Sequence, residues 1–503
     1  MGKVTAYQAG VVAFVALGAF TYGFAFAVFV TSIGQPGFYA YFNLDSTSSY
    51  TASIIGAVNS LFAAGAAAGA IIQGWVGDWL GRKKAIIISQ LFCVGGGALC
   101  AGSVNIAMLV SCRFFQGIGL GQSITLVSVY LTEVAHKNNR GLLSGLTACS
   151  LASGYVVCSW VGFAAFFSSN QVLQWRLPLA LACVSPLITL SGIYWIPESP
   201  RYLVWAERKE EAWTVLRRLH HDASDPEELS AHAEFQQIVL QVDYDKQQNT
   251  GYIQMFRKPT WRGRSLLVIF LLFATQATGI LGIGNFQVLI YNSLGITGYM
   301  ALLFYCMYAL IGTIPNFFCA YFMDRIGRRR LLLMGYVAVT LLLIVEMLLQ
   351  KQYIGTTSKA GNAAAVAMLW IWVGLYGFFL DPPQFVYCAE IFPTTLRAKG
   401  IALGFAAYFV GAITFTTPSA TAFNNIGWKM YLVYIACNCV TVVVIYFFVP
   451  ETSNLSLEEI GELFGDKVVV HLTADGHGIV EEEEVKQIEA EKSVHERIER
   501  IEV

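Results

Sequence analysis

The sequence predicts an all-α, polytopic membrane protein with about twelve transmembrane helices in two pseudo-symmetric six-helix halves. Two observations support this fold class. Hydrophobic residues make up 56% of the 503 residues and charged residues only 13%, against ~25% charged in a typical soluble domain. In addition, short charged signatures recur in the same order at offsets close to half the chain length. A soluble core is too small to bury this much apolar surface, whereas a bilayer covers it.

The membrane spans follow from the apolar stretches. Each stretch has ~20 residues, which is enough to cross ~30 Å of hydrocarbon at 1.5 Å per residue. The spans must be helical, because lipid offers no partner to an unpaired backbone amide or carbonyl. We place them near 11–33, 51–74, 85–104, 106–130, 142–167, 175–196, 265–293, 298–322, 331–350, 363–389, 400–422 and 428–449.

Three repeated signatures indicate a duplicated unit. The run from Gly77 to Lys84 matches the run from Met323 to Arg330, with the two aspartates 324 − 78 = 246 residues apart. Glu133 with Arg140 matches Glu390 with Arg397 at an offset of 390 − 133 = 257. Glu198 in Pro-Glu-Ser matches Glu451 in Pro-Glu-Thr at 451 − 198 = 253. We therefore expect two copies of one unit.

The predicted domains follow from this repeat. We expect an N-terminal six-helix half at 1–197, a cytoplasmic linker at 198–264, a C-terminal six-helix half at 265–450 and a cytoplasmic acidic tail at 451–503. The linker mixes tryptophan and leucine with charged residues at helical spacing, which predicts short amphipathic helices. The tail contains the acidic run Glu481–Glu484, which is typical of a solvated helix or a disordered segment.

Lysine and arginine fall on one side of this layout, after the second, fourth, eighth and tenth spans. By the positive-inside rule both termini are cytoplasmic, and we expect a multi-pass protein of the plasma membrane. No cleavable signal is predicted, because a basic region at the start is nearly absent and the first apolar run is long enough to remain as a span. The eleven cysteines lie inside spans and are expected to pack as free thiols.

The ordered set of motifs resembles the major facilitator superfamily and, within it, the sugar porter family over about residues 15–465. The Gly34-Gln35-Pro36 stretch is similar to the fungal branch of sugar transporter-like proteins. The marks of the family are Gly77-Asp78 with Gly81-Arg82-Lys83, Arg113, Glu133 with Arg140, Pro197-Glu198-Ser199, Gln276, Asp324 with Gly327-Arg328, Glu390 with Arg397, and Pro450-Glu451-Thr452. The resemblance implies the fold of that superfamily and transport of a solute by alternating access.

Opposite charges at the cytoplasmic helix ends suggest a gate. Our hypothesis is that they pair at partly reduced dielectric, close the inward side while the protein opens outward, and part when it opens inward. The alternative is static charge that only sets the topology. The candidate gating residues are Asp78, Arg82, Glu133, Arg140, Glu198, Asp324, Arg328, Glu390, Arg397 and Glu451.

The expected substrate site, near the midplane between the halves, departs from the family pattern. The acid of coupled members in the first span is replaced by Ala25, and most of the sugar-binding amides have been lost. One acid has been gained: Asp381 lies nine residues from Glu390, ~13.5 Å along an ideal helix. The candidate substrate-binding residues are Thr275, Gln276, Asp381, Phe385, Tyr408 and Phe409.

Three ionisable residues inside spans have open roles. Asp381 is expected either to contact substrate or carry a proton, or to serve as a solvated or helix-capping group before Pro382. Arg113 is expected to extend toward the outer mouth or to bond backbone carbonyls, with binding of an anionic substrate as the alternative. Glu346 is expected at the membrane interface.

The sequence therefore predicts a transporter for a sugar or sugar-like polar solute. Loss of the first-span acid favours facilitated diffusion over the alternative, a proton symporter that uses Asp381. A second alternative is a non-transporting nutrient receptor of the same fold. The expected partners are a small-molecule solute and the lipid bilayer. No cofactor, metal or nucleic acid is expected, protein partners are not predicted, and no catalytic set of nucleophile, base and orienting group indicates an enzyme.

Overall fold

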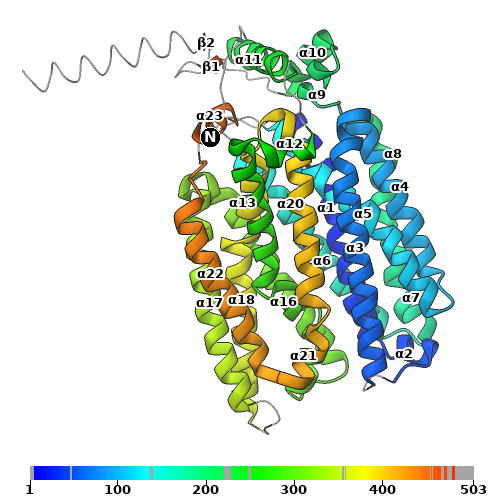
Figure 1. Ribbon diagram of the computed structural model, residues 1–503. Helices are drawn as coiled ribbons and strands as arrows, with labels where there is room; N and C mark the ends of the chain where they lie inside the picture. Colours follow the sequence, from blue (N-terminus) through cyan, green and yellow to red (C-terminus); the bar gives the residue numbers. More distant parts are fainter. Residues whose placement is uncertain are drawn as a thin grey trace, which may run out of the picture.

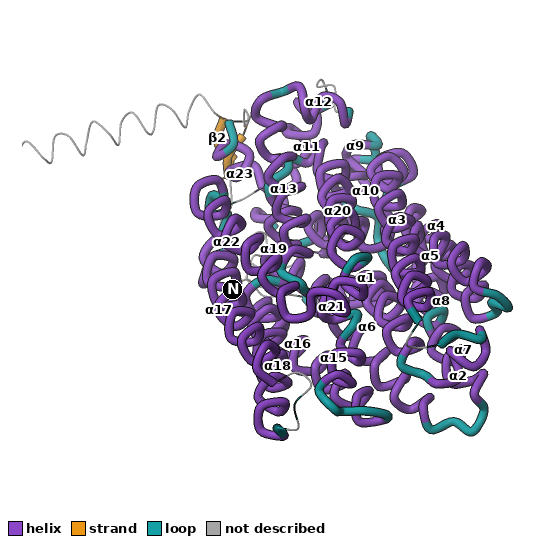
Figure 2. The backbone as a smooth tube through the Cα atoms, turned by 60° about the horizontal axis from the view of Figure 1, so that its bottom comes forward, coloured by secondary structure: helices purple, strands orange, loops and turns teal. Residues whose placement is uncertain are grey.

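The structure is a computed structural model that describes most of the chain. The described residues are 5–45, 48–135, 140–219, 228–246, 251–353, 356, 358–453, 455, 457–465, 470–472 and 479–481. The predicted solvated segment that follows Glu481 lies outside them. Within the described part the secondary structure is helical apart from one short hairpin of two strands (Figure 2).

Within the described residues, twelve helical segments are long and apolar enough to cross a membrane, which confirms the predicted number. Several begin at side chains that accept a hydrogen bond from the first turn, as Thr5, Asn105 and Ser358 do, and this satisfies donors that the helix itself leaves free. The first six spans are α1 (Ala6–Ile33), α3 (Ser49–Leu80), α4 (Arg82–Ala101), α5 (Ile106–Val134), α6 (Arg140–Phe166) and the pair α7 (Gln171–Leu181) and α8 (Val184–Gly192), extended by the 3-10 turn η2 (Ile193–Trp195).

The second six spans repeat this arrangement with more interruptions. They are α13 (Pro259–Ala277) with α14 (Ile280–Gly284) and α15 (Gln287–Ser293), α16 (Tyr299–Ile326), α17 (Arg328–Tyr353), α18 (Lys359–Phe379) with α19 (Asp381–Glu390), α20 (Thr394–Thr416), and α22 (Met430–Phe448) with the 3-10 turn η3 (Gly427–Lys429). Two short helices lie between spans at the opposite end from the chain start: α2 (Pro36–Phe42) and α21 (Ser419–Ile426) (Figure 1).

The prediction of continuous helices at 265–293 and 363–389 was wrong. The first breaks at Gly279, whose φ of +91° is a left-handed conformation that favours glycine. The second breaks at Leu380, because Pro382 and Pro383 have no amide hydrogen to continue the helical ladder. Both breaks lie inside the bundle, where side chains of neighbouring helices surround them, as non-helical backbone at membrane depth requires.

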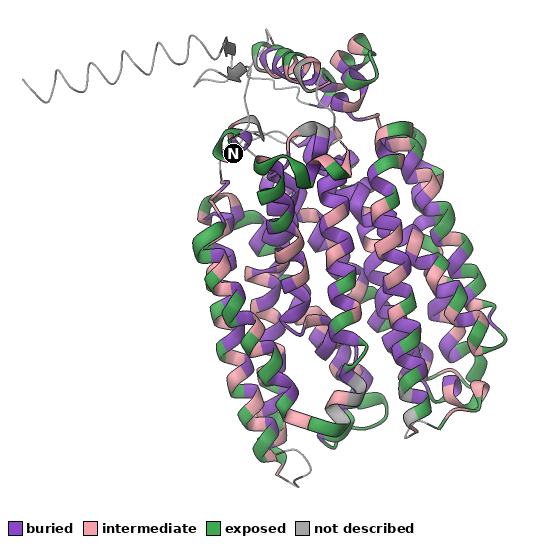
Figure 3. Ribbon diagram, viewed as in Figure 1, coloured by how far each residue is buried: buried purple, intermediate pink, exposed green. Residues whose placement is uncertain are grey.

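The two halves pack against each other through two helix pairs, α3 with α20 and α6 with α16. Buried residues face the interior of the bundle and exposed apolar residues cover its outer wall (Figure 3). This distribution fits a lipid-facing surface, since a bilayer rather than water meets the outer wall. All eleven cysteines are free thiols within the described residues, as expected.

The segment between the halves forms four helices: α9 (Pro200–Trp205), α10 (Lys209–Leu219), α11 (Leu229–Asp245) and α12 (Tyr252–Arg257). They lie on the end of the bundle where α1 begins (Figure 1). They contact the bundle through the Arg218 guanidinium, 4.1 Å from the Tyr7 ring centroid. The Tyr252 hydroxyl also donates to the Ile71 carbonyl at 3.0 Å.

The described part of the tail lies at the same end. It consists of α23 (Leu457–Leu463) and the antiparallel pair β1 (Val470–Leu472) and β2 (Ile479–Glu481). Arg264 of α13 donates to the carbonyl of Gly461 in α23 at 3.0 Å. This contact attaches the tail helix to the second half of the bundle.

Candidate functional site

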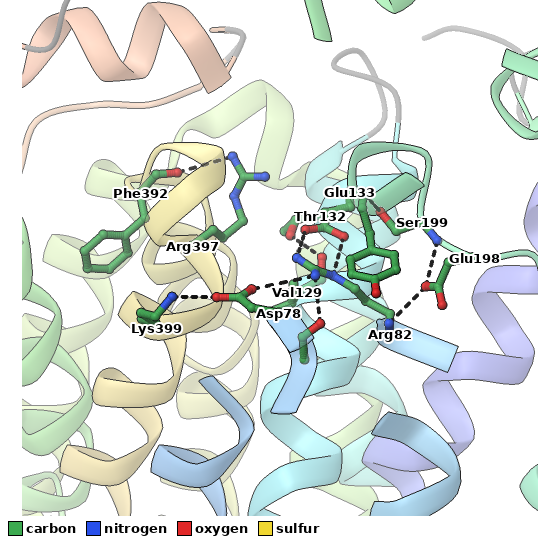
Figure 4. Close-up of polar contacts among 12 residues, drawn as sticks. Asp78, Arg82, Val129, Thr132, Glu133, Glu198, Ser199, Phe392, Arg397 and Lys399 are labelled. Carbon is green, nitrogen blue, oxygen red and sulfur yellow. Dashed lines mark hydrogen bonds and ion pairs between the residues drawn. The ribbon is translucent and has the colours of Figure 1, made fainter. Parts of the chain in front are cut away.

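Opposite charges gather at the end of the bundle where α1 begins and α22 ends, which we call the charged end (Figure 4). In the first half Arg82, at the start of α4, pairs with Glu133 near the end of α5. Its Nε donates to Oε2 at 3.0 Å and its Nη2 to Oε1 at 2.8 Å. The two side chains are 6% and 0% exposed, so the pair is a buried, bidentate ion pair. The two charges stabilise each other, and removal of either residue would leave the other as a buried charge without its partner.

Asp78 and Glu198 complete this group, the first ion cluster. Asp78 lies 3.7 Å from Arg82 across the end of α3. Glu198 accepts from the backbone amides of Arg82 at 3.0 Å and Lys83 at 3.2 Å, at the positive end of the α4 dipole. Burial raises the pKa of the Glu198 carboxyl above its ordinary value, while the hydrogen bonds of the neighbouring backbone amides and the charge of Arg82 act in the opposite direction.

The second half repeats the arrangement in a second ion cluster of Asp324, Arg328, Glu390 and Glu451. Arg328 lies 3.0 Å from Glu390 and 2.7 Å from Asp324. Glu451 accepts from the backbone amide of Arg328 at 2.8 Å. Glu390 also accepts from the Thr452 hydroxyl at 3.1 Å. The matched motifs of the sequence therefore form matched contacts.

A glycine precedes each arginine and permits this geometry. Gly81 has φ +86° and ψ 168°, and Gly327 has φ +96° and ψ 148°, a region that is almost restricted to glycine. The carboxylates of Glu198 and Glu451 lie against these glycines, where a Cβ would stand. The turn thus lets a carboxylate reach the first amides of the following helix.

Other residues join the two halves at this end. The repeated Arg and Glu residues pair within one half, as Arg82–Glu133 and Arg328–Glu390 do, and their role in gating stays a prediction. The halves are joined by Lys399 of α20, whose Nζ lies 2.6 Å from the Asp78 carboxylate, and by the Leu142 amide, which donates to Asp324 at 3.3 Å.

Two further members of the predicted set have less direct contacts. Arg397 is fully buried and donates to the Phe392 carbonyl at 3.2 Å (Figure 4). The side chain of Arg140 lies outside the described residues. Sequence reasoning did not include Lys399 in the set. Lys399 lies two residues after Arg397 on α20. Its pairing with Asp78 becomes visible only when α20 is packed against α3.

A cavity of about 100 Å³ lies between the halves. Its wall includes Tyr155 of α6 from the first half and residues of α14, α16, α18 and α20 from the second half. Beside it, the Thr313 hydroxyl of α16 donates to the Ala152 carbonyl of α6 at 3.1 Å, which is another contact across the halves. The cavity therefore lies where the resemblance predicts a substrate site.

Three polar atoms of the wall have no hydrogen-bond partner in the described structure. They are the hydroxyl of Tyr308, Nδ2 of Asn285 and Oδ1 of Asn316. A buried polar group without a partner costs free energy. Their presence in the wall is therefore expected of a site that a polar solute or water occupies.

Of the six predicted substrate residues, Asp381 and Tyr408 line this cavity. The other four lie in the layer behind its wall. Phe385 stacks on Phe405 with ring centroids 5.5 Å apart, and Phe409 packs on Tyr22 at 5.8 Å. Thr275 and Gln276 are buried at the end of α13, where Thr275 donates a hydrogen bond to Gln384.

Two other ionisable residues have defined surroundings. Arg113 is fully buried and donates to the Ala25 carbonyl at 2.8 Å and to Gln116 at 3.0 Å, so the alternative that it bonds backbone carbonyls is confirmed. Its guanidinium also lies 4.2 Å from the Phe62 ring centroid. Glu346, which is expected at the membrane interface, is 1% exposed and accepts from Gln350 at 2.7 Å; its depth in the membrane stays a prediction.

The wall residues that sequence reasoning missed include four tyrosines: Tyr155, Tyr305, Tyr308 and Tyr376. Each lies inside an apolar span, where the hydrophobic residue count includes tyrosine and so does not mark its hydroxyl. The available signal was the presence of a hydroxyl deep within a span, since such groups require a partner.

Comparisons with known proteins agree with this architecture. A family model described as sugar (and other) transporter matches residues 11–464. The MFS-type transporter criB of Aspergillus cristatus is 32% identical over 489 residues, which cover 97% of this chain and 98% of that protein. The high-affinity glucose transporter 1 of Candida albicans is 27% identical over 465 residues, with coverages of 89% and 84%.

Solved structures show the same fold. The proton:xylose symporter XylE bound to 6-bromo-6-deoxy-D-glucose superposes with a TM-score of 0.81 at 21% identity. The match covers 92% of this chain and 100% of that chain.

Proposed function

Because this chain belongs to the sugar porter family of the major facilitator superfamily, and is a multi-pass membrane transporter, we propose that it carries a sugar or sugar-like small polar solute by alternating access. The observation that carries the proposal is the cavity between the halves, whose wall presents unpartnered polar atoms of Tyr308, Asn285 and Asn316. A glucose transporter among the relatives supports sugars as the first solutes to test.

The cavity is smaller than a binding pocket for such a solute. Its volume of about 100 Å³ lies below the ~300–1,000 Å³ of ligand pockets. Admission of a solute therefore requires the halves to separate at one end. We assign Asp381 and Tyr408 to direct contact with the solute, and Thr275, Gln276, Phe385 and Phe409 to the layer that positions the wall.

We assign gating to the contacts at the charged end. The two ion clusters hold each half rigid, and the bonds of Asp78 with Lys399 and of Asp324 with the Leu142 amide are the ties that break when that end opens. The density of lysine and arginine there supports a cytoplasmic location of this end and of both termini. A plasma membrane location remains part of this proposal.

Replacement of Lys399 by Met tests the tie between the halves. The side chains of Lys399 and Asp78 are 11% and 29% exposed. We expect loss of this partly buried pair to shift the equilibrium about tenfold toward the form open at the charged end, since ~1.4 kcal/mol corresponds to a factor of ten. The measurement is the rate at which a thiol reagent supplied at that end modifies the buried Cys149 of α6, in a variant whose other cysteines are replaced.

Lys83→Met is the matched control for this experiment. Lys83 donates to the Tyr194 carbonyl at 3.3 Å within the same half, so its loss breaks no tie between the halves. Equal modification rates in the Lys399 and Lys83 variants would contradict the gating role.

We propose facilitated diffusion as the transport mode. The position that carries an acid in coupled relatives is Ala25, and its backbone carbonyl already accepts from Arg113. We expect purified protein in liposomes to equilibrate glucose, xylose or myo-inositol without accumulating it, whether or not a proton gradient is imposed. Accumulation that an uncoupler collapses would instead support the proton symporter that uses Asp381. Specific binding of these solutes without flux would support the receptor alternative.

A further inference from the structure

The cavity wall contains an acidic side chain and no basic side chain that would balance its charge. Among its described lining residues Asp381 is the one charged group, and Lys, Arg and His are absent from them. Asp381 is half-buried and lies at the break between α18 and α19, so its carboxylate remains accessible from the cavity. A carboxylate held away from bulk water needs a proton, a cation or strong donors.

The side chains that hydrogen-bond to Asp381 are the neutral amides of Gln384 and Asn316. The Gln384 amide nitrogen lies 3.3 Å from the Asp381 Oδ1, but that nitrogen is shared with the Tyr376 hydroxyl, also at 3.3 Å. The other titratable side chains near Asp381 are Tyr22 of α1, Tyr155 and Cys149 of α6, Cys319 of α16, Tyr376 of α18 and Tyr408 of α20. None of these side chains is cationic.

Five tyrosines share the wall with this acid: Tyr155, Tyr305, Tyr308, Tyr376 and Tyr408. The rings of Tyr305 and Tyr308 are stacked with centroids 6.5 Å apart, while Tyr408 packs on Phe385 at 5.9 Å. Aromatic faces carry negative partial charge, and several such faces around a cavity attract an organic ammonium group. The rings therefore favour the same sign of ligand charge as the carboxylate does.

From the acid, the tyrosines and the absence of basic lining residues, we infer that the cavity selects solutes that carry an ammonium group, such as an amino sugar, over their neutral analogues. The ammonium group pairs with Asp381, while the hydroxyls of the solute bond to Tyr308, Asn285 and Asn316. This inference rests on the proposed function, because it specifies the solute class of the same cavity.

The test compares glucosamine with glucose and N-acetylglucosamine at about pH 7, where most of an amine is protonated and a carboxyl is more ionised than at lower pH. Binding to the purified full-length protein is measured by thermal shift, and uptake is measured in liposomes. We expect glucosamine to be preferred at least about tenfold over both neutral sugars. The added affinity comes from a charge-assisted hydrogen bond to Asp381 and from the surrounding aromatic rings.

Three variants show which group makes the selection. In Asp381→Asn, which keeps the shape and a hydrogen-bonding oxygen, the preference should disappear, whereas Asp381→Glu should retain part of it. Glu346→Gln is the control, because it neutralises a buried acid of α17 that does not line the cavity, and its preference should equal that of the wild type. A melting curve of each purified variant shows that the protein is folded.

Each outcome has a distinct meaning. Equal transport of glucosamine and glucose, or a preference that survives in Asp381→Asn, overturns the inference and leaves the proposed function in place. Proton-driven accumulation of glucose that Asp381→Asn abolishes assigns the carboxylate to a proton and also overturns the inference. Absence of both binding and flux for all three sugars removes the inference and the sugar-like solute together.

Discussion

Replacement of Glu133 by Gln is expected to destabilise the folded protein by about 3–5 kcal/mol, the usual cost of removing one member of a buried ion pair. The reason is the surroundings of Arg82, whose side chain is 6% exposed and would lose its bidentate partner while keeping Asp78 at the longer distance of 3.7 Å. The loss is measured as a lower melting temperature and a lower yield of monodisperse protein in detergent. Transport should fall in parallel, because fewer molecules are folded.

A double variant distinguishes a charge effect from a packing effect. Joint replacement of Arg82 and Glu133 by Met and Leu removes both charges and should recover much of the lost stability. Arg208 with Glu211 provides the control pair, since these side chains are 56% and 46% exposed. Replacement of Glu211 by Gln should cost less than about 1 kcal/mol. Equal melting temperatures of the Glu133 and Glu211 variants would contradict a large contribution of the buried Arg82–Glu133 pair to stability.

Replacement of Gly81 by Ala is expected to cost at least about 1–3 kcal/mol, the strain of a side chain in a backbone conformation that is nearly restricted to glycine. The new Cβ would also meet the Glu198 carboxylate and the Tyr202 ring. Glu198 would then have to leave the amides of Arg82 and Lys83. The measurement is again thermal unfolding of the purified variant, with the same change at Gly327 as the symmetric test.

Gly95→Ala is the matched control within the same helix. Gly95 lies in the interior of α4, and an added Cβ there meets no atom within 4 Å. Alanine should therefore be neutral or stabilising by about 0.5–1 kcal/mol. A destabilised Gly95 variant beside an unaffected Gly81 variant would contradict the role assigned to the turn.

The fold was predictable because its signals are local or repeated. Span length and apolar composition require only counting, and the duplicated order of Asp78, Arg82 and Glu133 identified the two halves. The breaks at Gly279 and Leu380 were missed because each lies inside a long and mostly apolar stretch, although Gly279 and Pro382 stand in the sequence as possible causes. Span prediction from apolar composition finds where the chain can cross the membrane, and it does not show whether the helix is continuous there.

The site was less predictable because it depends on how each helix is rotated. Asp381 and Tyr408 were identified because they stand at substrate-site positions of the family that the chain resembles, whereas Tyr155 and Tyr305 became visible as wall residues only once α6 and α16 were placed side by side. Lys399 likewise pairs with Asp78, which lies 321 residues earlier in the chain. Pairings of this range depend on tertiary packing, which the spacing of residues within one span does not encode.

The break in the tenth span leaves α19 as a separate rod of ten residues, with Asp381 as its first residue and Glu390 as its last. A helix of this length is stiff, so its two ends move as one body over ~13.5 Å. One end touches the cavity, and the other holds Arg328. A solute that moves the Asp381 carboxylate therefore also moves the Glu390 carboxylate. Binding in the cavity can in this way change the contacts of the charged end through one rigid helix, without a chain of intervening side chains.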